Sequence, residues 1–300
     1  MIQVRGLAKS FGDFTALKDL DMTVETGSVY GLIGVNGSGK TTLIRQLTGV
    51  LRPDAGSITI DGVPVYDNID VKKRVGYVPD ELFFMGNYSL NAMASFYRGL
   101  YKSWNEERFR AMTESFGLKP GQRLSRMSKG MQKQAAFILV MSAMPDYLIL
   151  DEPIDGLDPL VRRKVWHYIV EDVAERQMTV LVSSHNLREM EDICDSIGII
   201  SKGEMKIEQD LDELKSDIHK VQVAFDDDAE GMEALGRLNM VHHETRGSVH
   251  LAIIREKREK VEEVLGSASP KIMDILPLSL EEVFIYEMGG ENSDVSAVLK

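Results

Sequence analysis

The sequence has 300 residues, which is long enough for one large domain and a smaller one. With 43% apolar and 27% charged residues, it is too apolar for a wholly disordered chain. Its formal net charge of −12 argues against sequence-independent nucleic-acid binding, which depends on Lys and Arg contacts to phosphate. The single cysteine, Cys194, cannot form an internal disulfide, which predicts a reducing compartment and excludes a Cys-based zinc site.

The first half of the chain begins with strands and continues with helices. Residues 1–30 show partial alternation broken by glycines, and a compact apolar strand at 29–34 leads into a glycine-rich turn and an amphipathic helix. From about residue 87 to 143 the pattern is helical. Within it, Ser103 and Glu106 have the spacing of a capping box, which predicts a helix beginning there.

The second half alternates strands with helices until the composition changes. An apolar strand over 147–153, a helix over 159–177 and a strand over 178–185 predict a mainly parallel sheet covered by helices on both faces. Residues 216–300 carry 17 acidic and 9 basic side chains, hence most of the net charge, but they keep core-like apolar stretches. We therefore expect a small α+β domain there, rather than a disordered acidic tail.

The segment 34–42, GVNGSGKTT, matches the pattern G-x-x-x-x-G-K-[ST] of a phosphate-binding loop. Glycines at 34, 37 and 39 allow the backbone N–H groups to turn inward as a nest for phosphate oxygens at the start of a helix. Lys40 would reach the β- and γ-phosphates, and the Thr41 hydroxyl would bind Mg²⁺. The match lies between an apolar strand and an amphipathic helix, as this mechanism requires. The loop residues predicted to bind nucleotide are Gly34, Val35, Asn36, Gly37, Ser38, Gly39, Lys40, Thr41 and Thr42.

Two acidic residues follow the apolar strand YLIL at the point where a second catalytic group would lie. Asp151, at the strand end, is expected beside the phosphate loop, where it would hold Mg²⁺ through water. Glu152 is expected to act as the general base that polarises the attacking water. An ordinary acidic strand-to-loop junction is the alternative, and the phosphate loop makes it much less favourable.

These residues, with several ordered motifs, resemble the ATP-binding subunits of ABC transporters over residues 1 to about 215. SKGMQ at 128–132 resembles the signature motif, DGLD at 155–158 resembles the D-loop, and SSH places His185 as the switch histidine. The resemblance implies an α/β P-loop NTPase of ABC type with a mainly parallel sheet, an antiparallel β subdomain and a helical subdomain (about 87–143). Residues 1–215 would form this nucleotide-binding domain, and 216–300 a small C-terminal α+β accessory domain.

The resemblance also implies a site shared between two subunits. In this family, two nucleotide domains close face to face on two ATP molecules, and each site combines one subunit's phosphate loop with the other's signature motif. Ser128 and Gly130 begin an apolar helix whose N-terminus would attract the γ-phosphate delivered by the partner. His185 would sense that phosphate, and Phe11 would stack on adenine. Asp158, in the D-loop, would contribute to nucleotide binding.

One position departs from the family pattern. The family usually has Gln after GYVP, where it contacts Mg²⁺ and the attacking water, whereas this chain has Asp80. Asp is shorter, anionic and acceptor-only. We expect Asp80 to keep the metal role with an altered rate or coupling.

The segment after Asp80 is a candidate docking surface for a membrane partner. Its apolar residues Phe83, Phe84, Met85 and Tyr88 would either line a groove for a coupling helix or belong to the core of the helical subdomain. These two interpretations are equally weighted, and an exposed apolar patch would favour the groove.

The pattern of residues 6–62 and the EEVF segment near the end are similar to ATPase subunits of ABC-2-type exporters, in particular those of bacterial operons that respond to antibiotics. The function expected is Mg²⁺-dependent ATP hydrolysis in a homodimer or a paralogous heterodimer, driving export through a separate membrane permease. Since no membrane span or secretory signal is visible, the chain would lie in the cytoplasm against the inner face of the membrane. The alternatives are a soluble ABC-type regulator, which would usually bring two nucleotide domains or a basic surface, and a GTPase or small-molecule kinase, for which no N-K-x-D motif occurs.

Overall fold

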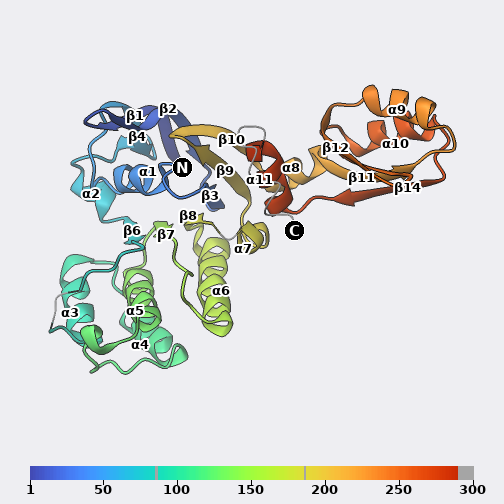
Figure 1. The fold of residues 1–300 in the computed structure, drawn as a ribbon. Helices are drawn as coiled ribbons and strands as arrows, with labels where there is room; N and C mark the ends of the chain where they lie inside the picture. The colour runs from blue at the N-terminus through green and yellow to red at the C-terminus, as the bar shows by residue number, and fades with distance from the viewer. Residues whose placement is uncertain (85–86, 186, 290–300) are drawn as a thin grey trace. The chain divides into compact units, whose positions relative to one another are not determined.

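The computed structural model describes residues 1–84, 87–185 and 187–289 (Figure 1). By their contacts, the described residues within Met1–His185 and Ile193–Glu208 form one compact unit, and those within 187–192 and 209–289 form a second. The sequence analysis placed the boundary after residue 215. The contacts divide the chain earlier, after Glu208. Within the second unit, Lys215 pairs with Glu191 at 3.1 Å and the Leu280 N–H donates to Glu191 at 3.1 Å.

The first unit opens with a long antiparallel hairpin. Its strands β1 (Ile2–Phe11) and β2 (Phe14–Val24) are joined where Phe11 pairs with Phe14, and the sheet has the order β2-β1-β4-β5, with β4 (Ala55–Ile60) and β5 (Val63–Pro64). Alternate apolar side chains of β1, such as Ile2 and Val4, are fully buried. This period of two fixes one face of the sheet toward the core. The antiparallel β subdomain expected from the sequence is therefore confirmed.

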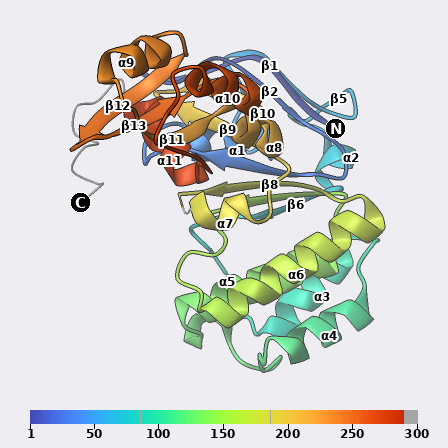
Figure 2. The same cartoon turned by 90° about the vertical axis from the view of Figure 1, so that its right-hand side faces the viewer.

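The second sheet of this unit is mainly parallel. Its order is β10-β9-β3-β8-β7-β6, and β9, β3, β8, β7 and β6 are parallel neighbours. The bounds are β3 (Val29–Ile33), β6 (Val75–Val78), β7 (Tyr147–Asp151), β8 (Thr179–Ser184), β9 (Ser196–Ser201) and β10 (Glu204–Asp210). Every residue of β3, β7 and β8 is buried, as expected for strands covered on both faces. Figures 1 and 2 both show α1 (Lys40–Leu47) on one side of these strands and α5 (Lys129–Ser142) and α6 (Pro159–Arg176) on the other.

The helical segment lies between β6 and β7 in the chain. It contains α3 (Leu90–Leu100), α4 (Glu106–Ser115), the short 3-10 turn η1 (Leu124–Arg126) and α5, while α2 (Ile69–Lys72) precedes β6. The predicted capping box at Ser103 is wrong. Asn105 caps α4 by accepting from the Arg108 N–H at 2.9 Å, whereas the Ser103 hydroxyl donates to the Ala143 carbonyl at 2.6 Å. The Ser103 hydroxyl instead binds one of the carbonyls that lack a helical partner at the end of α5. A local sequence pattern does not reveal this long-range contact.

The second unit has the β-α-β-β-α-β order of a ferredoxin-like fold. Its sheet has the order β12-β13-β11-β14, and every pair of neighbours is antiparallel. The elements are α7 (Leu187–Glu191), α8 (Leu211–Asp217), β11 (His219–Ala224), α9 (Asp228–Gly236), β12 (Met240–Arg246), β13 (Val249–Ile254), α10 (Arg258–Gly266), β14 (Ile272–Pro277) and α11 (Leu280–Gly289). Val221, Leu235, Ile254 and Val261 are fully buried in a core of its own. The small α+β fold that the sequence suggested for this region is thus observed.

Among the described residues, no helix combines the length and the apolarity that crossing a bilayer would require.

Candidate active site

In the glycine-rich segment 34–42, residues 34–39 form a loop between β3 and α1, and residues 40–42 begin α1. Gly37 and Gly39 have φ values of +80° and +114°, a region that side chains with a Cβ rarely occupy. A Cβ at Gly39 would also lie 2.8 Å from the Ala16 carbonyl oxygen. Ser38 is buried, and in the described part of the chain its hydroxyl has no hydrogen-bond partner. Such a tight loop at a helix N-terminus, with a buried hydroxyl to spare, fits a bound phosphate group.

Lys40 begins α1, and its side chain folds back over the loop. The Nζ donates to the Gly34 carbonyl at 2.6 Å and to the Val35 carbonyl at 3.4 Å, and it lies 3.8 Å from Oε1 of Glu152. Burial lowers the pKa of Lys40, and the carboxylates of Glu152 and Asp151 partly offset this effect. A phosphate bound beside the ammonium would raise the pKa again, so anion binding and protonation of Lys40 support each other.

Four parallel strands bring the other predicted groups to the same edge of the sheet as the loop. The carboxyl ends of neighbouring parallel strands meet at one edge, and in open α/β sheets ligands bind there. The loop follows β3, Asp80 follows β6, Asp151 ends β7, and His185 follows β8. Residues that are far apart in the sequence therefore converge on the phosphate loop.

Asp151 is buried at the end of β7 and is held in place by a neighbouring strand. The Ser183 hydroxyl, on β8, donates to Oδ1 of Asp151 at 2.6 Å. One carboxylate oxygen is thereby fixed, which orients the other. Ser183 is not among the residues predicted from the sequence, where its only signal is its position in the same SSH motif as His185.

Glu152 lies between Lys40 and His185. Its Oε2 is 2.8 Å from Nδ1 of His185, and its Oε1 faces Lys40. The Glu152 side chain is only 15% exposed, whereas that of His185 is 60% exposed. The backbone φ of Glu152 is +48°, a left-handed value that costs a non-glycine residue roughly 1–3 kcal/mol. The structure thus holds this carboxylate in a strained, defined orientation that suits a general base.

Asp80 is half exposed and forms an ion pair that the sequence analysis did not anticipate. Its Oδ1 lies 3.1 Å from Nζ of Lys133, on α5. The same Nζ donates to the main-chain carbonyl of Glu152 at 2.9 Å. For Lys133, the only signal in the sequence is its position one turn into the signature helix.

The remaining predicted residues lie at the ends of elements. Ser128 caps α5 by accepting from the Met131 N–H at 3.3 Å, and Asp158 caps α6 by accepting from the N–H groups of Leu160 and Val161, each at 3.1 Å. Gly130 is in the first turn of α5, where a Cβ would lie 3.3 Å from the Gly156 carbonyl oxygen.

Phe11, at the end of β1, is 49% exposed, with Nζ of Lys9 over its ring at 5.6 Å. Val35, Asn36 and Thr41 are exposed, and Thr42 is half-buried.

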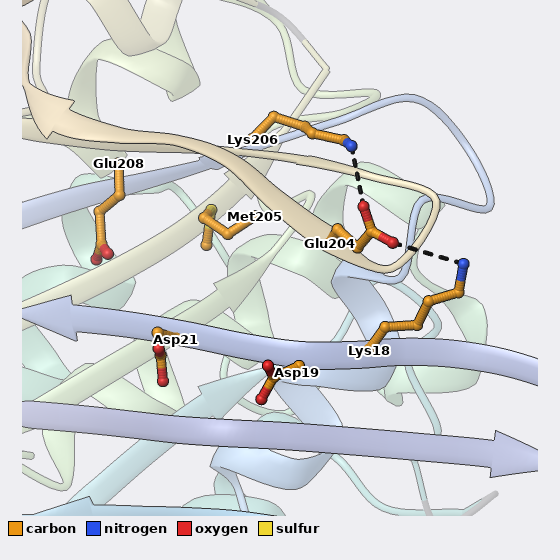
Figure 3. Close-up of a pocket in the computed structure, with 7 residues that line it drawn as sticks. All are labelled: Lys18, Asp19, Asp21, Glu204, Met205, Lys206 and Glu208. Atoms are coloured by element: carbon orange, nitrogen blue, oxygen red, sulfur yellow. Dashed lines mark hydrogen bonds and ion pairs between the residues drawn. The ribbon is translucent and has the colours of Figure 1, made fainter.

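A separate groove of about 500 Å³ lies between β2 and β10 (Figure 3). Its lining residues are Lys18, Asp19, Asp21, Glu204, Met205, Lys206 and Glu208. Glu204 pairs with both lysines, at 3.6 Å from Lys18 and 2.9 Å from Lys206, so the remaining carboxylates leave the groove acidic. It shares no lining residue with the phosphate loop.

Comparison with known proteins agrees with this geometry. A family model described as ABC transporter matches residues 17–155. The chain is 33% identical over 291 residues to the ABC transporter ATP-binding protein YtrB of Bacillus subtilis (strain 168), covering 97% of this chain and 99% of that protein. It is 31% identical to the linearmycin resistance ATP-binding protein LnrL of the same strain, over 68% of each chain. A solved structure of an ATP binding subunit of an ABC transporter is similar at a TM-score of 0.67 and 26% identity, over 72% of this chain and 92% of that chain.

The fold and the site define a P-loop ATPase of ABC type. The chain belongs to the family of ABC transporter ATP-binding proteins.

Proposed function

We propose that this chain is the ATP-binding subunit of an exporter, and that it hydrolyses ATP in a dimer to drive transport through a separate membrane permease. The observation that carries the proposal is the position of Glu152, whose carboxylate lies between the Lys40 ammonium and the His185 imidazole beside the phosphate loop. The relative named for transport supports a role in transport, and the relative named for resistance to linearmycin supports the export direction.

Hydrolysis requires groups that hold the phosphates and a group that accepts a proton. The backbone N–H groups of the loop and Lys40 would bind the β- and γ-phosphates. Glu152 would accept a proton from water as the water oxygen attacks the γ-phosphorus. The bond from that phosphorus to the β–γ bridging oxygen then breaks, leaving ADP and phosphate. His185, 2.8 Å from Oε2 of Glu152, would orient this carboxylate and contact the γ-phosphate.

The residues present fit Mg²⁺ as the cofactor. Thr41 and Asp151 would hold it, with Asp80 as a third candidate, and the hydrogen bond from Ser183 already orients Asp151. When bound, the ion would neutralise charge on the transferred phosphoryl group.

The dimer is proposed because the N-terminus of α5, at Ser128, would bind an anion that comes from a second subunit. Ser128 accepts a hydrogen bond within the first turn of α5, and the free N–H groups of that helix N-terminus favour an anion. A γ-phosphate supplied by a second subunit, identical or paralogous, would be that anion. We infer no nucleic-acid partner, and we place the dimer on the inner face of the membrane through its permease.

Glu152→Gln tests the mechanism. The amide cannot accept the proton, so ATP turnover should fall about 100-fold or more while ATP binding persists. With ATP and Mg²⁺ the variant should therefore elute from a sizing column as a long-lived dimer. Glu175→Gln, an exposed substitution on α6, is the control and should leave turnover and elution unchanged. A Glu152→Gln protein that stays monomeric with ATP, or that hydrolyses ATP at the parent rate, would contradict both the base assignment and the dimer.

A further inference from the structure

Lys133 joins two strand ends in the active site. Its ammonium lies 3.1 Å from Oδ1 of Asp80, after β6, and donates to the main-chain carbonyl of Glu152, after β7, at 2.9 Å. The Lys133 side chain is only 11% exposed, so solvent has little access to its contact with the Glu152 carbonyl, whereas the ion pair with the half-exposed Asp80 is screened more. Because Lys133 is on α5, the helix that Ser128 caps, one side chain connects the signature helix with the hydrolytic residues.

The contact to Glu152 bears on the orientation of the general base. A left-handed φ at a non-glycine residue persists only where the surrounding structure enforces it. The Glu152 N–H donates to the carbonyl and to the hydroxyl of Ser183, each at 3.2 Å, and the Glu152 carbonyl accepts from Lys133. Both ends of the residue are therefore fixed, and removal of Lys133 would release one of them.

The contact to Asp80 bears on the charge of the site. Asp80 adds a negative charge at a position where the resemblance predicts a neutral Gln. Together with Asp151 and Glu152 it would place three carboxylates around a triphosphate, which repels each of them. The Lys133 ammonium balances Asp80, so the acidic residue and the basic residue compensate each other.

We propose that Lys133 is a positioning residue for ATP hydrolysis: it holds the main chain of Glu152 and neutralises Asp80. This inference rests on the proposed function. It assigns two separable effects to one side chain, one on the turnover rate through Glu152 and one on nucleotide affinity through Asp80.

The test is a double-mutant cycle with Lys133→Met, which keeps the apolar stem, and Asp80→Asn, which keeps the shape of the carboxylate. Lys133→Met should lower kcat about tenfold or more and weaken binding of the fluorescent analogue mant-ATP, measured in EDTA, about fivefold. In the double variant, mant-ATP affinity should return to within about twofold of the parent, because both charges are gone. Its kcat should stay low, because the Glu152 carbonyl still lacks its donor.

Two further variants separate positioning from stability. Lys133→Arg keeps the charge and should recover kcat to within about threefold of the parent. Lys164→Met removes another half-buried lysine that donates to a main-chain carbonyl, that of Ser115, away from the site. It should leave kcat and mant-ATP affinity unchanged, whatever it does to the unfolding temperature.

The proposal is overturned if Lys133→Met keeps the parent kcat, if adding Asp80→Asn does not restore the mant-ATP affinity of Lys133→Met, or if Lys164→Met lowers kcat equally. These outcomes differ from failure of the proposed function. If Glu152→Gln assembles the ATP-bound dimer while Lys133→Met behaves as the parent, only the positioning role is lost.

Discussion

Single residues in the phosphate loop show how closely this site is packed. The Cα of Gly34 is so enclosed that a Cβ there would lie 2.5 Å from the Ile200 carbonyl oxygen and 2.5 Å from Oγ of Ser38. The first of these atoms belongs to the backbone of β9 and cannot move aside cheaply. The requirement for glycine at this position is therefore steric, and it comes from a strand far away in the sequence.

Gly34→Ala should destabilise the first unit by about 1–3 kcal/mol through overpacking, and should weaken mant-ATP binding with it, because the loop must shift. Thermal unfolding and a mant-ATP titration measure the two effects. Gly99→Ala is the matched control. It is the same change on α3, where a Cβ would meet nothing within 4 Å, so it should leave stability unchanged or raise it by up to about 1 kcal/mol. Equal losses in the two variants would contradict the steric argument.

Among the elements, α11 begins with a capping box whose acidic residue, Glu282, also pairs with a lysine. The Ser279 N–H donates to Oε2 of Glu282 at 3.0 Å, and the Glu282 N–H donates to Oγ of Ser279 at 3.2 Å, which is a reciprocal capping box. Oε1 of Glu282 accepts from Lys220 on β11 at 2.8 Å. Although burial favours the neutral acid, the hydrogen bonds from Lys220 and Ser279 outweigh it and lower the pKa of Glu282 below its usual 4.5.

Glu282→Gln should therefore lower the free energy of unfolding of the second unit by about 1 kcal/mol at pH 7. A carboxyl whose pKa is lower in the folded state stabilises the fold above its unfolded pKa and loses this effect as the pH falls through the folded pKa. The difference between variant and parent should thus shrink as the pH is lowered below 4.5, as thermal unfolding at several pH values would show.

The control for this prediction is Glu281→Gln. Glu281 pairs with Arg188, which is 82% exposed, so its replacement should change stability little at any pH. A Glu282→Gln difference that is independent of pH would show that the capping geometry, and not the charge, stabilises α11.

At the scale of the whole molecule, one exposed apolar segment bears on the partner. Phe83 is 92% exposed and Tyr88 is 37% exposed, while Phe84 is half-buried and Met85 lies outside the described residues. Phe96 and Leu100, on α3, are 42% and 53% exposed. Exposed apolar side chains that form a contiguous patch mark interaction sites, whereas single ones are common on protein surfaces. Their exposure favours the docking interpretation over the core interpretation.

We therefore expect Phe83→Ser to weaken capture of the proposed membrane permease about tenfold or more in a pull-down from solubilised membranes, with ATPase activity of the isolated protein unchanged. Ile69→Ser, at a residue that is 70% exposed on α2, is the control and should retain the permease. Full retention by Phe83→Ser would place the docking surface elsewhere. Recovery of ribosomes or DNA, and no permease, would instead favour a regulatory ATPase.

The sequence predicts the structure of the first unit in more detail than that of the second. Residues 34–42 and 147–152 predicted a phosphate loop and a carboxylate strand because both motifs are local: the spacing of a few residues decides their geometry. The second unit offered only core-like stretches, and its ferredoxin-like strand order follows from pairings such as Val221 with Ala252 and with Ile275, which no short pattern encodes. The predicted cap at Ser103 failed for the same reason, since its acceptor, the Ala143 carbonyl, is 40 residues away.

Local spacing was thus sufficient to predict the groups of the candidate site: a nest of backbone N–H groups, an ammonium, and two carboxylates after an apolar strand. Tertiary structure decided how these groups are oriented. Ser183 fixes Asp151, His185 meets Glu152, and Lys133 binds both Asp80 and the Glu152 carbonyl, because parallel strands and α5 bring together side chains separated by between 19 and 53 residues. Contacts of that range depend on strand order and helix packing, so they emerge only once the whole chain has folded.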